Sequence, residues 1–323
     1  MTEVKFDSDV KAADAFVEKY SELKQEIGKV IVGQEHAIDA VLISIFSKGH
    51  CLLVGVPGLA KTLLVNTIAD TLGLAFSRIQ FTPDLMPSDI IGAEILDEHK
   101  QFKFVKGPLF SNIILADEIN RTPPKTQAAL LEAMQERSVT AAGHTYKLDN
   151  PFFVLATQNP IEQEGTYPLP EAQLDRFMFN IWVDYPTLEE EIAVVKNTTA
   201  GTDTKANRIM GAEEIIYFQE LVRKIPIADN VLEYAVKLTN KTRPGQANTP
   251  KMVDKYLSWG AGPRASQYLV IGAKCHALSK GKYSPDIEDV RAIAKLVLRH
   301  RVVRNYKAEA EGYSVEKIIT ELF

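Results

Sequence analysis

The segment from Gly55 to Thr62, which reads Gly-Val-Pro-Gly-Leu-Ala-Lys-Thr, constrains this chain more than any other. An apolar run at residues 51–54 precedes it, and a run with helical character at residues 63–72 follows it. A strand, a glycine loop, Lys-Thr and a helix in this order predict a phosphate-binding loop. The backbone N–H groups of such a loop, with the helix N-terminus behind it, form a positive concavity for a polyphosphate.

Within this loop, Lys61 is expected to reach the β- and γ-phosphates of a nucleotide, and the Thr62 hydroxyl to ligate Mg²⁺. Ala60 stands where the pattern G-x-x-x-x-G-K-[ST] has glycine. Alanine is the smallest residue with a Cβ, so the loop is tolerable provided that φ at Ala60 is negative. The other nucleotide contacts expected here are Gly55, Pro57, Gly58, Leu59, Ala60 itself and Leu63.

Residues 113–118 form an apolar strand that ends in two carboxylates, Asp117 and Glu118. Beside a phosphate loop, Asp117 is expected to hold Mg²⁺ directly or through water, and Glu118 to orient and activate the attacking water. A strand that ends in solvated acids is a common alternative. The phosphate loop upstream favours the catalytic interpretation.

Composition excludes several classes of protein. The chain has 323 residues, which is long for one domain and comfortable for two. It has no apolar run of about 18 residues, and its N-terminus lacks the pattern of a signal peptide, so we expect a cytoplasmic protein with no membrane span.

Cys51 and Cys275 are expected to be reduced core thiols. A net charge of −5 makes nucleic acid an unfavourable main partner. The histidines show no metal-ligand spacing, so Mg²⁺ bound with ATP is the only metal expected.

Alternating strands and helices predict a parallel α/β sheet. The expected strands are residues 51–55, 76–80, 113–117, 152–157 and 180–183. Insertions near residues 81–105 and 138–148 alternate like hairpins. After residue 185 helical periodicity dominates, which predicts an α/β nucleotide-binding domain at residues 1–185 and an all-helical lid domain at residues 186–323. Residues 12–30 are expected to form an amphipathic helix, and residues 197–207 and 240–249 to form exposed loops.

The ordered motifs of this chain resemble those of the MoxR family of AAA+ ATPases, which commonly carry alanine before the loop lysine. The resemblance covers nearly the whole chain and is dense from residue 31 to 186. It implies a phosphate-loop AAA+ core with a five-stranded parallel sheet and a helical lid. The motifs that carry it are Ile31-Val32-Gly33-Gln34, the phosphate loop, Gly107-Pro108-Leu109-Phe110, residues 115–121, residues 126–134, Ala156-Thr157-Gln158-Asn159-Pro160 and residues 164–177.

The resemblance implies further site residues. Asn159 matches the sensor 1 residue that helps Glu118 hold water, although an asparagine in a turn before proline is the simpler alternative. Arg176 matches the arginine finger that acts on a neighbouring subunit, with an ion pair to Asp175 as the alternative. Arg264 matches sensor 2, with a surface arginine near a helix start as the alternative. Val32 and Gly33 are expected near the base of the nucleotide.

The resemblance also implies a biological role, which is chaperone-like remodelling or maturation of protein complexes. The expected partners are a protein client or a protein with a von Willebrand factor A domain, together with further copies of the chain in a hexameric ring. The alternatives are a chelatase-like subunit that drives metal insertion, a nucleic-acid-linked motor, and a non-enzymatic scaffold. The basic stretch at residues 299–304 is expected to be a solvated or subunit-facing helix side.

Overall fold

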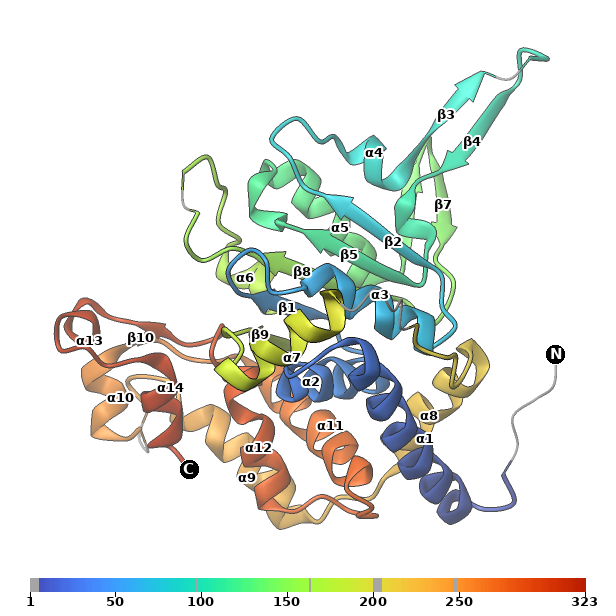
Figure 1. Cartoon of the computed structure of the whole chain (residues 1–323). Helices are drawn as coiled ribbons and strands as arrows, with labels where there is room; N and C mark the ends of the chain where they lie inside the picture. Colours follow the sequence, from blue (N-terminus) through green and yellow to red (C-terminus); the bar gives the residue numbers. More distant parts are fainter. Residues whose placement is uncertain (1–5, 97, 163, 200–204, 247–248) are drawn as a thin grey trace.

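The computed structural model describes residues 6–96, 98–162, 164–199, 205–246 and 249–323. At its centre is a five-stranded sheet with the strand order β2-β5-β8-β1-β9, in which every pairing is parallel (Figure 1). The predicted parallel α/β core is therefore confirmed, and each predicted strand end lies within one residue of the observed one. The strands are β1 (Cys51–Val54), β2 (Phe76–Gln80), β5 (Ile113–Asp117), β8 (Phe153–Gln158) and β9 (Phe179–Trp182).

Helices cover both faces of this sheet, which explains why the central strands β1, β5 and β8 are largely apolar and buried. Cys51 and Leu53 belong to one hydrophobic cluster, together with residues of helices α1, α2 and α3. Leu52 and Val54 point to the opposite face and belong to a second cluster, which includes residues of α5. These helices are α1 (Asp9–Val30), α2 (Glu35–Phe46), α3 (Lys61–Thr71) and α5 (Pro124–Glu136).

The C-terminal part is mainly helical, as the sequence predicts. Its helices are α7 (Leu188–Thr199), α8 (Ala212–Lys224), α9 (Asp229–Lys241), α10 (Lys251–Tyr256), α11 (Pro263–Ser279), α12 (Ile287–Leu298), α13 (Tyr306–Ala310) and α14 (Val315–Thr320). It also contains a short antiparallel strand pair, β10 (Leu257–Trp259) with β11 (Val303–Arg304), so the expectation of an all-helical lid is wrong in this detail. Strands of two or three residues are too short to give an alternating pattern. They form only because two segments far apart in the sequence lie side by side in the fold.

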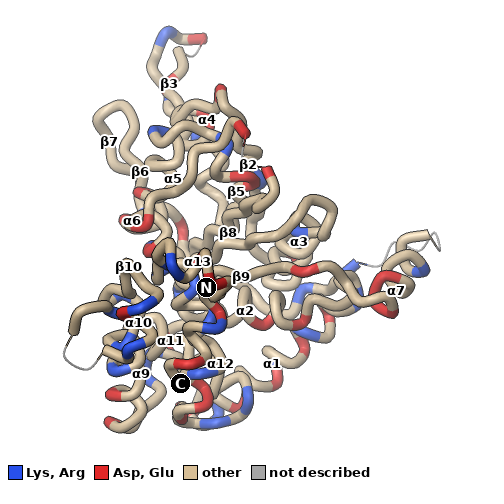
Figure 2. Tube along the Cα trace, turned by 90° about the vertical axis from the view of Figure 1, so that its left-hand side faces the viewer, with Lys and Arg blue, Asp and Glu red and all other residues tan. Residues whose placement is uncertain are grey.

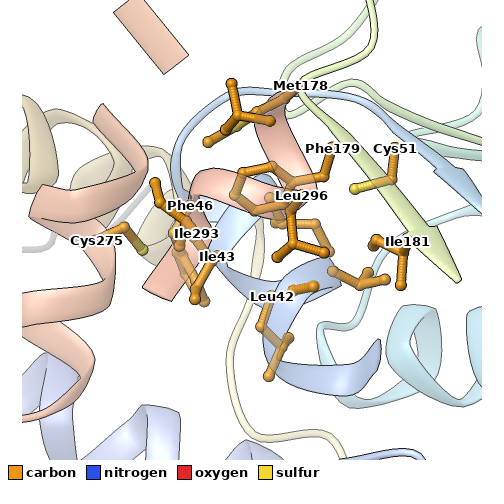
Figure 3. Packing of buried hydrophobic residues seen from close by; sticks show 14 of the residues in the cluster. Leu42, Ile43, Phe46, Cys51, Met178, Phe179, Ile181, Cys275, Ile293 and Leu296 are labelled. Atoms are coloured by element: carbon orange, nitrogen blue, oxygen red, sulfur yellow. The ribbon is translucent and has the colours of Figure 1, made fainter. Parts of the chain in front are cut away.

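The helical part and the sheet share one hydrophobic core. Figure 3 shows Phe46 of α2 and Phe179 of β9 close to Ile293 of α12, where the two parts meet. Cys51 and Cys275 are buried free thiols, as expected, and burial raises the pKa of each to about 12. The domain boundary near residue 185 stays a prediction.

Each of the two predicted insertions contains a hairpin. The first pairs β3 (Gly92–Leu96) with β4 (Phe102–Lys106) and projects beyond the sheet (Figure 1). The second pairs β6 (Ser138–Ala141) with β7 (His144–Lys147). The rings of Phe104 and Tyr146 stack with centroids 4.3 Å apart, so the second hairpin braces the first. The short elements between them are α4 (Pro87–Ile91), η1 (Pro108–Phe110), η2 (Ile119–Arg121) and, further on, α6 (Glu171–Leu174).

The basic stretch after α12 is not a solvated surface. The Arg301 side chain is only 2% exposed and donates to Asp175 Oδ1 at 2.8 Å and to the Phe177 carbonyl at 2.6 Å. Arg301 therefore binds the segment before β9 to the helical part, and the expectation of a solvated or subunit-facing side is wrong for this residue. Elsewhere basic and acidic residues are interspersed along the chain (Figure 2).

Two other expectations need adjustment. Helix α7 extends to Thr199 and α9 to Lys241, so the expected loops at 197–207 and 240–249 begin later than predicted. Residues 200–204 and 247–248 of those loops lie outside the described residues. In the described part of the chain, no helix has both the length and the apolar character needed to cross a membrane.

Candidate functional site

The carboxyl ends of β1, β5 and β8 meet at a cavity of about 380 Å³. Parallel strands place their carboxyl ends at one edge of a sheet, which is where α/β proteins bind ligands. The lining brings together many of the predicted site residues and adds two that the sequence did not predict, Arg78 and Thr157. The full lining is Pro57, Gly58, Leu59, Ala60, Lys61, Thr62, Arg78, Asp117, Glu118, Thr157 and Asn159.

The loop backbone depends on two left-handed residues. Gly58 has φ of +85° and Ala60 has φ of +53°. The condition stated for an alanine here, a negative φ, is therefore not met. The Ala60 carbonyl accepts the Leu64 N–H at 2.9 Å and so begins α3, which holds the residue in a conformation that costs an alanine about 1–2 kcal/mol. Alanine is tolerated here at an energetic cost that glycine would avoid.

Lys61 begins α3 and points its ammonium group back across the loop. Its Nζ donates to the Gly55 carbonyl at 2.5 Å and to the Val56 carbonyl at 3.0 Å. Burial lowers the pKa of Lys61, while the carboxylates of Asp117 and Glu118 oppose this change. The two acids therefore favour the cationic form of the lysine, which is the form that can oppose phosphate charge.

Asp117 is held on both of its carboxylate oxygens. Thr157 donates its hydroxyl to Asp117 Oδ1 at 2.6 Å, and the same hydroxyl accepts the Glu118 N–H at 2.8 Å. Arg78 donates to Asp117 Oδ2 from Nη2 at 2.6 Å and from Nε at 3.1 Å. Thr157 thus fixes the turn that carries both acids, and Arg78 neutralises the first of them.

The donor set of the cavity suits Mg²⁺. Asp117 and Thr62 supply a carboxylate and a hydroxyl in one cavity lining, and Mg²⁺ prefers such hard oxygen ligands. Among the described residues, no group of three or more His, Cys, Asp or Glu side chains could hold a metal ion. Magnesium is usually bound by one or two carboxylates together with substrate phosphates. The residues present therefore fit a metal that arrives with a nucleotide.

Glu118 lies at a backbone turn with φ of +55° and accepts two side-chain hydrogen bonds. Its Oε2 accepts Gln80 Nε2 at 3.1 Å and Arg121 Nη1 at 3.2 Å. Arg121 also pairs with Glu162 at 3.1 Å. The sequence analysis missed Gln80 and Arg121. The available signal was the pair of polar residues, Arg78 and Gln80, at alternate positions of a predicted sheet strand.

Asn159 follows β8 and is buried. Its Oδ1 accepts the Ile161 N–H at 3.1 Å, which is an Asx-type turn. The residue also lines the cavity beside Glu118. The turn interpretation and the sensor interpretation are therefore compatible, because a turn can hold the side chain at the cavity.

Several predicted residues are not among those that line this cavity. They are Val32, Gly33, Gly55, Leu63, Arg176 and Arg264. Arg264 Nη1 pairs with Asp175 Oδ2 at 2.9 Å, while the Arg176 carbonyl accepts the Tyr268 hydroxyl at 3.2 Å. The described partners of Asp175 are Arg264 and Arg301, so the ion pair suggested as the alternative role of Arg176 is not observed.

The segment with Val32 and Gly33 lies next to the loop. Gln34 Nε2 donates to the Leu59 carbonyl at 3.1 Å. A Cβ added to Gly33 would lie 2.6 Å from Glu190 Oε1, so α7 packs closely on this segment. The chain before α2 and the first helix after residue 185 therefore approach each other beside the loop.

Comparisons with known proteins agree with this geometry. Residues 50–179 match the model of the ATPase family associated with various cellular activities (AAA), and residues 250–322 match the AAA lid domain. The chain is 43% identical over 298 residues to the chaperone MoxR1 of Mycobacterium tuberculosis, which covers 92% of this chain and 79% of that protein. It is 32% identical over 295 residues to the protein MoxR of Methylorubrum extorquens, with 86% of each chain covered. A crystal structure of a candidate ATPase from Cytophaga hutchinsonii superposes with a TM-score of 0.91 at 45% identity, over 97% of this chain and 95% of the other.

Proposed function

Because this chain belongs to the MoxR family of AAA+ ATPases, we propose that it binds ATP with Mg²⁺ in the cavity described above and hydrolyses it to ADP and phosphate. One observation carries the proposal. Lys61 of the glycine loop and the adjacent acids Asp117 and Glu118 come from two separate parts of the chain and line the same cavity. A cation, a metal ligand and a base at one polyphosphate site are the parts that phosphoryl transfer requires.

Each site residue has its own role in ATP hydrolysis. Lys61 exchanges the Gly55 and Val56 carbonyls for phosphate oxygens and neutralises their charge. Asp117 and Thr62 hold Mg²⁺, which supplies charge neutralisation at the phosphates when bound. Glu118 accepts a hydrogen bond from the attacking water and orients it in line with the γ-phosphate, with Asn159 as a second contact to that water. Gly55, Pro57, Gly58, Leu59, Ala60 and Leu63 shape the loop around the phosphates.

Val32 and Gly33 contact the base, and Arg264 approaches the phosphates from the helical lid. Arg264 pairs with Asp175 in the structure, so this role requires it to exchange that carboxylate for the nucleotide. Nucleotide binding would then draw the lid toward the core. This exchange is the means by which hydrolysis moves the two parts relative to each other.

Arg176 acts on a neighbouring copy of the chain. It is not among the residues that line its own cavity, and Asp175 beside it is already paired with two other arginines. We place it at the interface of a homo-oligomeric ring, with six copies as the expected number. There its guanidinium stabilises charge at the γ-phosphate of the next subunit.

The ring uses ATP hydrolysis for chaperone-like remodelling or maturation of protein complexes. The support for this role is the similarity to a protein named as a chaperone. The partner is a client protein or a protein with a von Willebrand factor A domain.

The test combines binding and turnover. Lys61→Ala should abolish binding of a fluorescent ATP analogue, because the main cation at the phosphates is gone. Glu118→Gln should keep binding and lose phosphate release. Turnover of Glu118→Gln at the wild-type rate would show that Glu118 does not activate water.

A further inference from the structure

Each of the two cavity carboxylates has an arginine partner, and the two arginines contact different acids. Arg121 pairs with Glu118, whereas Arg78 makes two hydrogen bonds to Oδ2 of Asp117, the acid expected to hold Mg²⁺. The other Asp117 oxygen, Oδ1, already accepts the Thr157 hydroxyl. Arg78 therefore occupies the oxygen of Asp117 that is not committed to the Thr157 contact.

A magnesium ion and the Arg78 guanidinium compete for this oxygen. Magnesium binds its ligands at about 2.0–2.1 Å in a near-octahedral arrangement. The guanidinium gives two hydrogen bonds to this one oxygen, which take up its lone pairs, and its positive charge would repel a metal ion bound there. Either Arg78 moves or the metal is kept from this oxygen.

Besides Asp117, Arg78 contacts Gln80, to whose Oε1 its Nη2 donates at 2.6 Å, and the side chain can move without disturbing the fold. Arg78 lies on β2, an edge strand of the sheet, and its side chain is 47% exposed, whereas that of Asp117 is 14% exposed. The backbone register from Phe76↔Ile113 to Gln80↔Asp117 holds β2 against β5 independently of this ion pair. The guanidinium can therefore swing away while the strand remains in place.

We propose that Arg78 is a resident counter-ion of Asp117 that Mg²⁺ must displace, and that this competition sets the Mg²⁺ concentration at which nucleotide is held. The inference rests on the proposed function, because it takes Asp117 as the metal ligand. It adds a role for a residue outside the loop and outside the acidic pair. Without Mg²⁺, Arg78 balances the negative charge of Asp117. Its presence raises the Mg²⁺ concentration that nucleotide binding requires.

The test is a Mg²⁺ titration of the binding of a slowly hydrolysed fluorescent ATP analogue. In Arg78→Gln, the Mg²⁺ concentration for half-maximal binding should fall by roughly threefold to tenfold, because the competing cation is gone. Arg78→Lys keeps the charge but loses the two-point contact, so its midpoint should lie between those of Arg78→Gln and the wild type. Arg121→Gln is the matched control, since it removes the same charge from a partner of Glu118 and should leave the midpoint unchanged.

Thermal unfolding gives a readout that does not depend on turnover. Without metal and nucleotide, Arg78→Gln should unfold at a lower temperature than the wild type, because Asp117 loses its partner. With saturating Mg²⁺ and analogue, the two proteins should unfold at similar temperatures.

An unchanged midpoint in an Arg78→Gln protein that binds the analogue would overturn the inference and leave the proposed function standing. An equal fall in Arg121→Gln would also overturn it, because the overall charge of the cavity would then be the cause. A loss of stability that Mg²⁺ and analogue do not restore would identify Arg78 as a structural tie. If the wild type bound no analogue at any Mg²⁺ concentration, the proposed function itself would fail.

Discussion

The Thr157 hydroxyl donates a 2.6 Å hydrogen bond to Asp117 Oδ1, and through it the end of β8 fixes the orientation of the carboxylate at the end of β5. The Thr157 hydroxyl oxygen also accepts the Glu118 N–H at 2.8 Å, where the backbone has already turned to a positive φ. A single hydroxyl thus positions both acids. Residues that orient a metal ligand are often worth about tenfold to a hundredfold in affinity or activity.

Thr157→Val should therefore lower the rate of ATP hydrolysis by roughly tenfold to a hundredfold, since it keeps the shape of the side chain and removes the hydroxyl. Thr157→Ser keeps the hydroxyl and is the matched control, with a rate close to that of the wild type. Phosphate release at saturating ATP measures both. Equal rates for the valine and serine variants would show that the hydroxyl has no positioning role.

Ala60→Gly should stabilise the protein by about 1 kcal/mol, because glycine adopts the left-handed conformation without the Cβ penalty. The gain is smaller than the full strain, since glycine also increases the entropy of the unfolded chain. Urea unfolding measures the difference. Ala292→Gly, on an exposed position of α12, is the control and should destabilise by about 1 kcal/mol. Destabilisation at both positions would contradict the strain assigned to Ala60.

Arg176→Ala should bind ATP nearly normally and hydrolyse it poorly. A finger supplied by a neighbouring subunit is typically worth roughly 10³–10⁵-fold in rate. Binding is preserved because Arg176 is not among the residues that line its own cavity. Binding of a fluorescent analogue and phosphate release, measured on the same preparation, separate the two effects.

Co-expression of Arg176→Ala with Glu118→Gln gives the sharper test. A mixed ring contains interfaces at which an intact Glu118 of one subunit meets an intact Arg176 of the next. Two inactive proteins should then recover part of the ATPase activity. No recovery in verified mixed assemblies would place Arg176 within its own subunit or give it a purely structural role.

His50 makes stability depend on pH. Burial lowers its pKa to about 4, and its ring accepts the Val154 N–H at 3.0 Å and contacts the Met134 carbonyl at 3.2 Å. The unfolded chain has a histidine pKa of about 6.5, so between about pH 6.5 and 4 the unfolded state binds the extra proton. The stabilising contribution of the neutral ring is fully present above about pH 6.5 and is lost as the pH falls toward 4.

Chemical unfolding of the wild type and of His50→Gln at pH 7.5 and pH 5 measures this effect. The variant should be less stable at pH 7.5 but should lose less stability on acidification, because glutamine does not titrate. Equal losses in the two proteins would assign the pH dependence to other groups, such as the buried His300, whose pKa burial also lowers.

The sheet and the centre of the site could be predicted from the amino-acid sequence alone. Strands β1, β5 and β8 are short, mainly apolar runs in the sequence. The loop at residues 55–62 directly follows the first of these runs, and the acids at 117 and 118 stand at the end of the second. Because parallel strands end at one edge of a sheet, these local patterns were enough to predict that Lys61, Asp117 and Glu118 share a cavity.

The contacts that hold these groups depend on how separate elements pack in three dimensions. Arg78 reaches Asp117, and Gln80 reaches Glu118, because the register of β2 against β5 brings together residues that are 38 or 39 positions apart. Arg301 is buried against Asp175 although its own segment looks like a basic surface. Local periodicity reports which face of an element is apolar. It cannot report which charged side chains become partners, since that depends on how separate elements are packed.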